Sequence, residues 1–176
     1  YRINPKIQYG FGDEKLRISG NFFYHINRTK FARFYLSGGR EATQFNSENP
    51  IRPFFSTAYN LLAKENFMKL YERDFVYTYY SQEVRNGLVM RLSSEYAQRR
   101  PLQVNSNYSW RKKDEAYEPN IPQVAELEDF DFENHSAFYV EANIRIRFAQ
   151  KYLTYPDRKY IMGTKYPTFR IIYQKA

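Results

Sequence analysis

The residues of this sequence with the greatest chemical capacity are arginines and carboxylates that recur at every second position within several segments. Alternate positions share one face of an extended strand, so each segment gathers its charges on one side. A face of this kind can pass or exclude charged solutes, or it can brace neighbouring strands through ion pairs. Because both signs of charge are present, bracing is the favoured interpretation. The predicted members of this charged set, which would face the lumen of the β-barrel predicted below, are Arg17, Arg33, Asp74, Arg91, Glu95, Arg99, Glu141, Arg145 and Arg147.

No residue pattern indicates catalysis, a cofactor or a bound metal. The chain has no cysteine, which excludes disulfides and thiolate metal sites. Neither His25 nor His135 has a second ligand at metal-binding spacing, and no nucleophile elbow surrounds a serine. The glycines of 9–13 and 37–41 do not precede a predicted helix, so a phosphate-binding loop has no support. We therefore predict that the protein is not an enzyme and has no catalytic residue, no cofactor and no metal.

Two clusters of opposite charge lie in the segment 101–134, which is predicted to be a long loop. The acidic stretch 126–133 has oxygen ligands suited to Ca²⁺, but it lacks the spacing of an EF-hand loop, and a solvated acidic patch is favoured. The basic cluster Arg111, Lys112 and Lys113 is a predicted contact for lipid phosphates or for an acidic loop of a partner, or else only keeps the loop soluble.

Apolar and polar residues alternate with a period of two through much of the chain, which is typical of β-strands. The one exception is 53–66, where apolar residues at helical spacing predict a short amphipathic helix. The sequence therefore predicts an all-β fold. Its predicted strands are 6–12, 16–26, 32–38, both halves of 75–100, 135–148 and 167–175.

The segment 75–100 is predicted to be a hairpin about its Asn-Gly dipeptide, because both central residues of a type I′ turn need positive φ. With a two-residue turn and regular pairing, Tyr77 lies opposite Tyr96, and Asp74 lies opposite Arg99. This register places apolar side chains together on one face and opposite charges across from each other on the other face.

The predicted strands are long, at about ten to fifteen residues, whereas strands of globular proteins average about five or six. Some ten tilted residues are what a strand needs to cross a bilayer. Short turns at one rim and long loops at the other are typical of outer-membrane barrels, although the connection 149–167 is long and lies at the short-turn rim. We predict that 1–176 is a segment of an antiparallel transmembrane β-barrel with about seven long strands.

In such a barrel the apolar column of each strand faces lipid, and aromatic side chains lie near the headgroups. The predicted lipid-facing residues are Phe22, Tyr24, Phe34, Phe75, Tyr77, Tyr79, Leu88, Met90, Leu92, Tyr96, Phe138, Val140, Ile144 and Ile146.

Composition leaves a second class of protein open. The net charge of +8 suits nucleic acid, lipid phosphates or an acidic partner. Aromatic residues make up 19% of the chain, yet no apolar stretch is long enough for a membrane helix. The alternative is a soluble basic β-sandwich that buries its apolar columns against a second sheet and binds nucleic acid or polysaccharide through an aromatic face.

Several phrases resemble, in order, the barrel domain of a Bacteroidota outer-membrane family of unknown function: YGFGDEKLRISG, GGREATQFNSENPI, KENFMKLYER, NGL, EYAQRRPL, NIP and YPDRKYIMGTKYPTFRIIY. Proteins of that family carry an N-terminal carboxypeptidase-regulatory-like domain before the barrel. The resemblance covers nearly all of the chain, and it implies an internal or C-terminal piece of a longer polypeptide. No catalytic or binding residue carries over, because none of these phrases has a known chemical role.

The resemblance implies a location in the bacterial outer membrane and a role as a transport, scaffold or assembly component of the cell envelope. The expected partners are outer-membrane lipid, lipopolysaccharide and other envelope proteins, with no nucleic acid.

Overall fold

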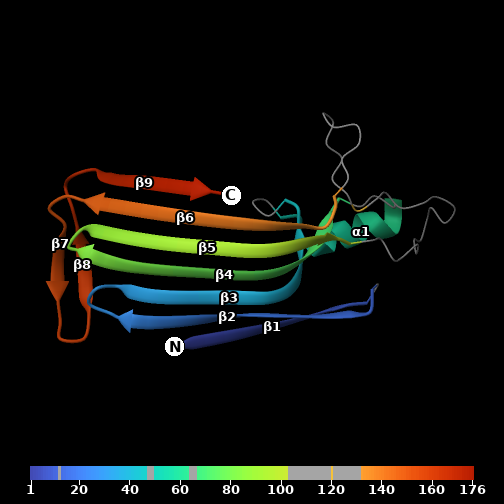
Figure 1. The fold of residues 1–176 in the computed structure, drawn as a ribbon, viewed down its shortest axis with the longest axis horizontal. Helices are drawn as coiled ribbons and strands as arrows, with labels where there is room; N and C mark the ends of the chain where they lie inside the picture. The colour runs from blue at the N-terminus through green and yellow to red at the C-terminus, as the bar shows by residue number, and fades with distance from the viewer. Residues whose placement is uncertain (12, 47–49, 64–66, 103–119, 121–131) are drawn as a thin grey trace.

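The computed structural model describes residues 1–11, 13–46, 50–63, 67–102, 120 and 132–176. Its main element is a seven-stranded sheet in which every neighbouring pair is antiparallel and the strands follow one another in chain order (Figure 1). The strands are β1 (Arg2–Gly10), β2 (Lys15–Asn27), β3 (Ala32–Gln44), β4 (Leu70–Arg85), β5 (Leu88–Pro101), β6 (His135–Arg147) and β9 (Thr168–Lys175).

The predictions of an all-β fold and of about seven strands are confirmed; β2 to β6 are long, with 13 to 16 residues each, whereas β1 has nine residues and β9 has eight. The sheet is not closed into a barrel: in the described part of the chain, β1 and β9 are its two edges. The predicted amphipathic helix is present as α1 (Pro53–Ala63). A second, two-stranded sheet, which was not predicted, is formed by β7 (Lys151–Thr154) and β8 (Lys159–Gly163).

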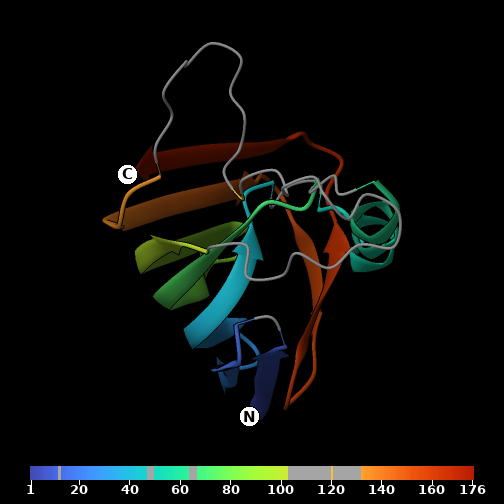
Figure 2. The same ribbon diagram turned by 90° about the vertical axis from the view of Figure 1, so that its right-hand side faces the viewer.

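The long sheet is curved like a trough, and the β7–β8 hairpin crosses its open side (Figure 2). The hairpin lies at the end of the strands that also holds the β2–β3 and β4–β5 turns, which we call the short-turn rim. Helix α1, the end of β5 and the start of β6 lie at the opposite end, the long-loop rim (Figure 1). The predicted division into short turns and long loops therefore holds, except for the β7–β8 hairpin and for the short β1–β2 turn at the long-loop rim.

The two faces of the long sheet differ sharply in polarity. The hairpin side is the concave face, because Lys159 of β8 forms an ion pair with Glu83 of β4 there. Large apolar side chains cover the opposite, convex face and remain exposed, for example Ile18 at 56%, Leu92 at 57% and Phe138 at 60%. Among the described residues, more polar and charged side chains than apolar ones are buried; the buried polar set includes Arg17, Ser19, Glu41, Glu72, Ser81, Glu83, Ser93, Asn143 and Gln150. The arrangement inverts that of a water-soluble domain.

The predicted register of the β4–β5 hairpin is wrong by one residue. Tyr77 lies opposite Glu95, and Asp74 lies opposite Gln98. The cause is a bulge at Val84, where two residues of β4 oppose one of β5. Because side chains alternate with a period of two, a slip of one residue moves every side chain of β4 to the other face.

This slip corrects the grouping of four predicted residues. Phe75, Tyr77 and Tyr79 lie on the concave face rather than with the apolar column of β5, and Asp74 lies on the convex face rather than with the other charges. The other lipid-facing candidates share the convex face, namely Phe22, Tyr24, Phe34, Leu88, Met90, Leu92, Tyr96, Phe138, Val140, Ile144 and Ile146. The concave face holds Arg33, Arg91, Glu95, Arg99, Glu141, Arg145 and Arg147.

Candidate functional site

The concave face carries a chain of ion pairs close to the long-loop rim. Glu41 of β3 lies opposite Arg73 of β4 in the ladder, and its Oε1 accepts a hydrogen bond from Arg73 Nη2 at 2.7 Å. Its Oε2 lies 3.1 Å from Lys6 Nζ of β1, and Arg73 Nη1 reaches Glu95 Oε1 of β5 at 3.3 Å. These contacts link four strands through side chains. They support the bracing interpretation. Of the four residues that make these contacts, only Glu95 was predicted.

A second ionic centre ties the β7–β8 hairpin to the sheet at the short-turn rim. Glu83 is 3% exposed. Its Oε1 accepts hydrogen bonds from Gly87 N–H at 3.0 Å and from Gln150 Nε2 at 2.8 Å, and its Oε2 forms an ion pair with Lys159 Nζ. Asn86 Nδ2 also donates to the Gln150 carbonyl at 2.6 Å. One buried carboxylate therefore holds together the β4–β5 turn and the hairpin. None of these residues was predicted as part of a site.

The remaining predicted charges make weaker contacts. Arg91 lies over the ring of Tyr79, with 5.4 Å between guanidinium carbon and ring centroid, and Arg99 lies over Tyr71 at 5.8 Å. Glu141 accepts hydrogen bonds from Tyr139 Oη at 3.1 Å and from Gln174 Nε2 of β9 at 3.0 Å; Arg147 Nη1 lies 3.5 Å from Gln150 Oε1.

Aromatic side chains fill the middle of the concave face. Tyr35 of β3 stacks on Tyr79 with ring centroids 5.3 Å apart and meets Tyr77 edge-on at 5.9 Å. Phe75 is 8% exposed and lies under the guanidinium of Arg73 at 4.2 Å. These rings pack inside the trough, so they separate its two ionic centres.

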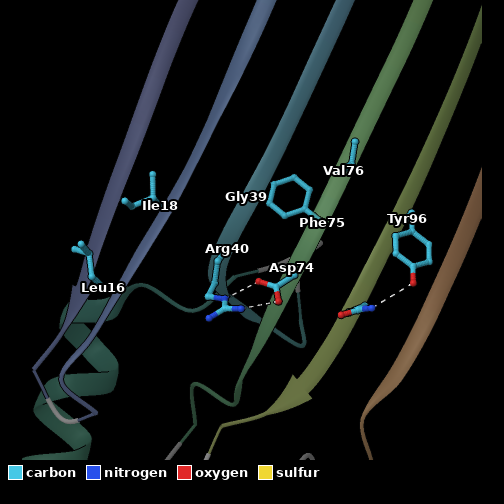
Figure 3. Close-up of a pocket in the computed structure, with 9 residues that line it drawn as sticks. Leu16, Ile18, Gly39, Arg40, Asp74, Phe75, Val76 and Tyr96 are labelled. Carbon is cyan, nitrogen blue, oxygen red and sulfur yellow. Dashed lines mark hydrogen bonds and ion pairs between the residues drawn. The ribbon is translucent and has the colours of Figure 1, made fainter.

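A charged cluster lies on the convex face at the long-loop end of its apolar surface (Figure 3). Arg40 of β3 forms a bidentate pair with Asp74, with distances of 2.6 and 2.9 Å, and Arg100 Nη2 reaches the same carboxylate at 2.8 Å. A shallow hollow of about 630 Å³ surrounds the pair. Its apolar lining residues include Leu16, Ile18, Val76 and Tyr96. The cluster marks where the apolar surface ends.

Arg17 is held between two carboxylates at the start of β2. It is 4% exposed, its Nε donates to Glu72 Oε2 at 2.8 Å, and its Nη2 forms an ion pair with Asp13 of the β1–β2 turn. The hydrogen bond from Arg17 lowers the pKa of Asp13 below 3.8. A carboxyl whose pKa is lowered by folding stabilises the folded state above its unfolded pKa, and that contribution is lost as the pH falls through the lowered value.

We expect Asp13→Asn in the full-length protein to lower the free energy of unfolding by about 1–2 kcal/mol at pH 7, because one charge-assisted hydrogen bond is lost. The difference from the unsubstituted protein should shrink as the pH falls from the ordinary pKa of an aspartate through the lowered pKa of folded Asp13, where the folded protein also binds the proton. Urea unfolding at pH 7 and pH 3 measures both values. The exposed neighbour Glu14 provides the control, since Glu14→Gln should leave the free energy of unfolding unchanged at both pH values. A loss of stability in Asp13→Asn that does not depend on pH would contradict the role of the ion pair.

Two predictions of absence concern the described residues only. No group of three or more His, Asp or Glu side chains among them is arranged to hold a metal ion. The one helix they contain, α1, has 11 residues and does not meet the length and apolarity that a membrane-spanning helix needs. The predicted loop contacts Arg111, Lys112 and Lys113 lie outside the described residues, as does most of the acidic stretch 126–133.

Comparison with known proteins identifies a family without assigning a chemical role. No curated protein and no solved structure matches the chain. The model of the C-terminal domain of a family of unknown function, DUF5686, matches residues 1–176. The match agrees with the resemblance to an unknown-function family; the bacterial group, the membrane and the additional domain stay predictions. The chain belongs to the DUF5686 family, and its residues 1–176 correspond to the C-terminal domain of that family.

Proposed function

We propose that this chain forms one wall of an outer-membrane β-barrel and serves the cell envelope as a transport, scaffold or assembly component without enzymatic activity. The observation that carries the proposal is the inverted distribution of polarity. Apolar side chains are exposed on the convex face, whereas charged side chains such as Glu41 and Glu83 are buried on the concave face. A sheet of this kind is unfavourable in water, and it matches a barrel with an apolar exterior and a polar interior.

The height of the apolar surface supports the proposal. On β5 the convex-face residues run from Leu88 to Tyr96 before Gln98 and the Arg40–Asp74 pair. Eight steps of about 3.4 Å give roughly 27 Å along the strand. At a tilt of about 40° this becomes roughly 21 Å, close to the ~25 Å apolar band of outer-membrane barrels. The Arg40–Asp74 pair would then lie at headgroup level, where charges are tolerated.

The open edges of the sheet support the need for further strands. All eight residues of β9 are exposed, and in the described structure β9 pairs with β6 alone. Unpaired backbone N–H and C=O groups are costly in hydrocarbon. Strands from elsewhere in the same polypeptide or from other copies would complete the wall. Within a completed barrel, the ion pairs that cross the concave face favour a braced interior over an open channel.

The soluble-sandwich alternative needs a second sheet over the apolar surface. Among the described residues the only other sheet is the β7–β8 hairpin, which lies on the concave side. Tyr35, Tyr77 and Tyr79, the stacked aromatics best suited to bind a base or a sugar, pack against one another inside the trough. No observation therefore favours that alternative.

The test is the intact mass of the native polypeptide together with its solubility with and without detergent. We expect a mass several-fold above the 21.3 kDa of this chain and solubility only in detergent. A 21.3 kDa polypeptide that stays monodisperse in plain buffer would contradict the membrane proposal.

A further inference from the structure

We propose that the cavity beneath the β7–β8 hairpin binds a phosphate-type oxyanion. The cavity has a volume of about 470 Å³, within the range of small-molecule sites. The trough forms its floor and the hairpin its roof. Its lining residues are His25, Arg28, Phe31, Arg33, Ser81, Val89, Arg145, Arg158, Lys159 and Ile161. Five of these ten are Arg or Lys, one is His, and none is acidic.

Two of the five cations are neutralised by carboxylates outside the cavity lining. Lys159 pairs with Glu83, and Arg158 Nε lies 3.0 Å from Asp157 Oδ2. Arg33 and Arg145 form no ion pair with any residue that the structure describes. The cavity therefore retains uncompensated positive charge.

The backbone register increases this excess of charge. Arg145 of β6 lies directly opposite Arg170 of β9, and like charges in directly opposed positions destabilise a sheet. A guanidinium cannot lose its proton to relieve the repulsion. The Nε atoms of Arg33 and Arg145 are also buried without a hydrogen-bond acceptor. Buried donors of this kind are normally satisfied, and an oxyanion in the cavity would supply acceptors for both Nε–H groups as well as the compensating charge.

The long-loop half of the same face provides an internal comparison. There the basic residues Lys6 and Arg73 are matched by Glu41 and Glu95 within hydrogen-bonding distance. Lys6 and Arg73 are therefore neutralised by carboxylates of the same chain, whereas Arg99 of this half lies over the ring of Tyr71 and forms no ion pair with a described residue. At the hairpin end Arg33 and Arg145 lack such carboxylates among the described residues, which is the condition expected where a ligand supplies them.

The chemistry of the lining favours a phosphate group. Guanidinium forks match phosphate and carboxylate oxygens in pairs, and several converging cations prefer a dianion to a single carboxylate. The phosphate has two possible sources: a soluble ion or solute, and the phosphorylated headgroup of a lipid. The site is built from described residues of this chain alone and does not depend on closure of a barrel.

The test is isothermal titration of the full-length protein with inorganic phosphate at low ionic strength, in detergent if the protein requires it. We expect saturable binding, with a dissociation constant of roughly 1 mM or lower. Arg145→Gln and Arg33→Gln should each weaken binding about ten-fold or more. The matched control is Lys151→Gln, a cation of the same hairpin that does not line the cavity, and it should leave affinity unchanged.

The result that overturns the proposal is either no saturable binding or an equal loss of affinity in all three variants, which would indicate non-specific attraction to a basic surface. Thermal unfolding verifies that each variant folds, and phosphate should raise the Tm of the unsubstituted protein but not that of Arg145→Gln. If Arg145→Gln fails to fold, Arg33→Gln carries the test.

A short-chain phosphatidic acid distinguishes the two sources of the phosphate. If it binds more tightly than inorganic phosphate and this binding is lost in the same variants, the ligand is a lipid headgroup. If it binds equally or more weakly, the ligand is a soluble phosphate.

Discussion

Leu92→Arg in the full-length protein should make folding into phospholipid vesicles less favourable by about 2–4 kcal/mol, the cost of an arginine at the bilayer midplane of a barrel. Leu92 is 57% exposed and lies halfway between Leu88 and Tyr96 on the convex face of β5. In water the same substitution at an exposed position changes stability by no more than about 0.5 kcal/mol. The size of the effect therefore separates lipid from water as the medium that the convex face contacts.

The matched control is Gln98→Arg, on the same strand and the same face but beside the Arg40–Asp74 pair. A charge at this depth should cost only about 0–1 kcal/mol, because it reaches the interface. Equilibrium urea unfolding from vesicles gives both values. Equal, small losses at Leu92 and Gln98 would exclude burial of the convex face in a bilayer.

Glu83→Ala should lower the free energy of unfolding by about 3–5 kcal/mol, the loss expected when one member of a buried ion pair is removed. The side chain of Lys159, which is 9% exposed, would lose its ion-pair partner, and Gln150 Nε2 would lose its 2.8 Å acceptor. The hairpin would also lose its main attachment to the sheet. We therefore expect faster proteolytic cleavage within 151–163, read by mass spectrometry, together with a lower urea midpoint.

Two further variants isolate the buried pair. Asp157→Ala removes a carboxylate of the same hairpin whose ion pair with Arg158 is about half exposed, so it should cost no more than about 1 kcal/mol. Glu83→Leu combined with Lys159→Met replaces the pair with apolar side chains and should recover much of the loss. A Glu83→Ala protein as stable as Asp157→Ala would contradict the role assigned to Glu83.

The strands were predictable because each has one apolar and one polar face, which gives the alternation that sequence reasoning detects. β4 is the exception that caused the register error. Both of its faces carry large apolar groups, with Val76 and Tyr80 on one side and Phe75, Tyr77 and Tyr79 on the other. Alternation alone therefore did not indicate its orientation, and the bulge at Val84 has no signature in an otherwise regular Asn-Gly hairpin.

The ionic centres were harder to predict than the strands. Glu41 and Arg73 meet because β3 and β4 pair, yet the connection between these strands is long, and nothing in the sequence fixes their register. The Glu83 centre depends on β7 and β8, whose four and five residues are too few for a clear periodic pattern. The sequence signal for the cavity beneath the hairpin is weaker. Arg33 and Arg145 each occupy a polar position in the alternating pattern of a strand that was predicted correctly.

The edges of the long sheet also have a direction. Six successive antiparallel pairings reverse the chain six times, so β9 runs the same way as β1. Joining these two edges directly, or repeating the seven strands around a barrel axis in several copies, would therefore create parallel seams. A fully antiparallel wall requires an odd number of additional strands between β9 and β1, which gives the even total usual for bacterial barrels.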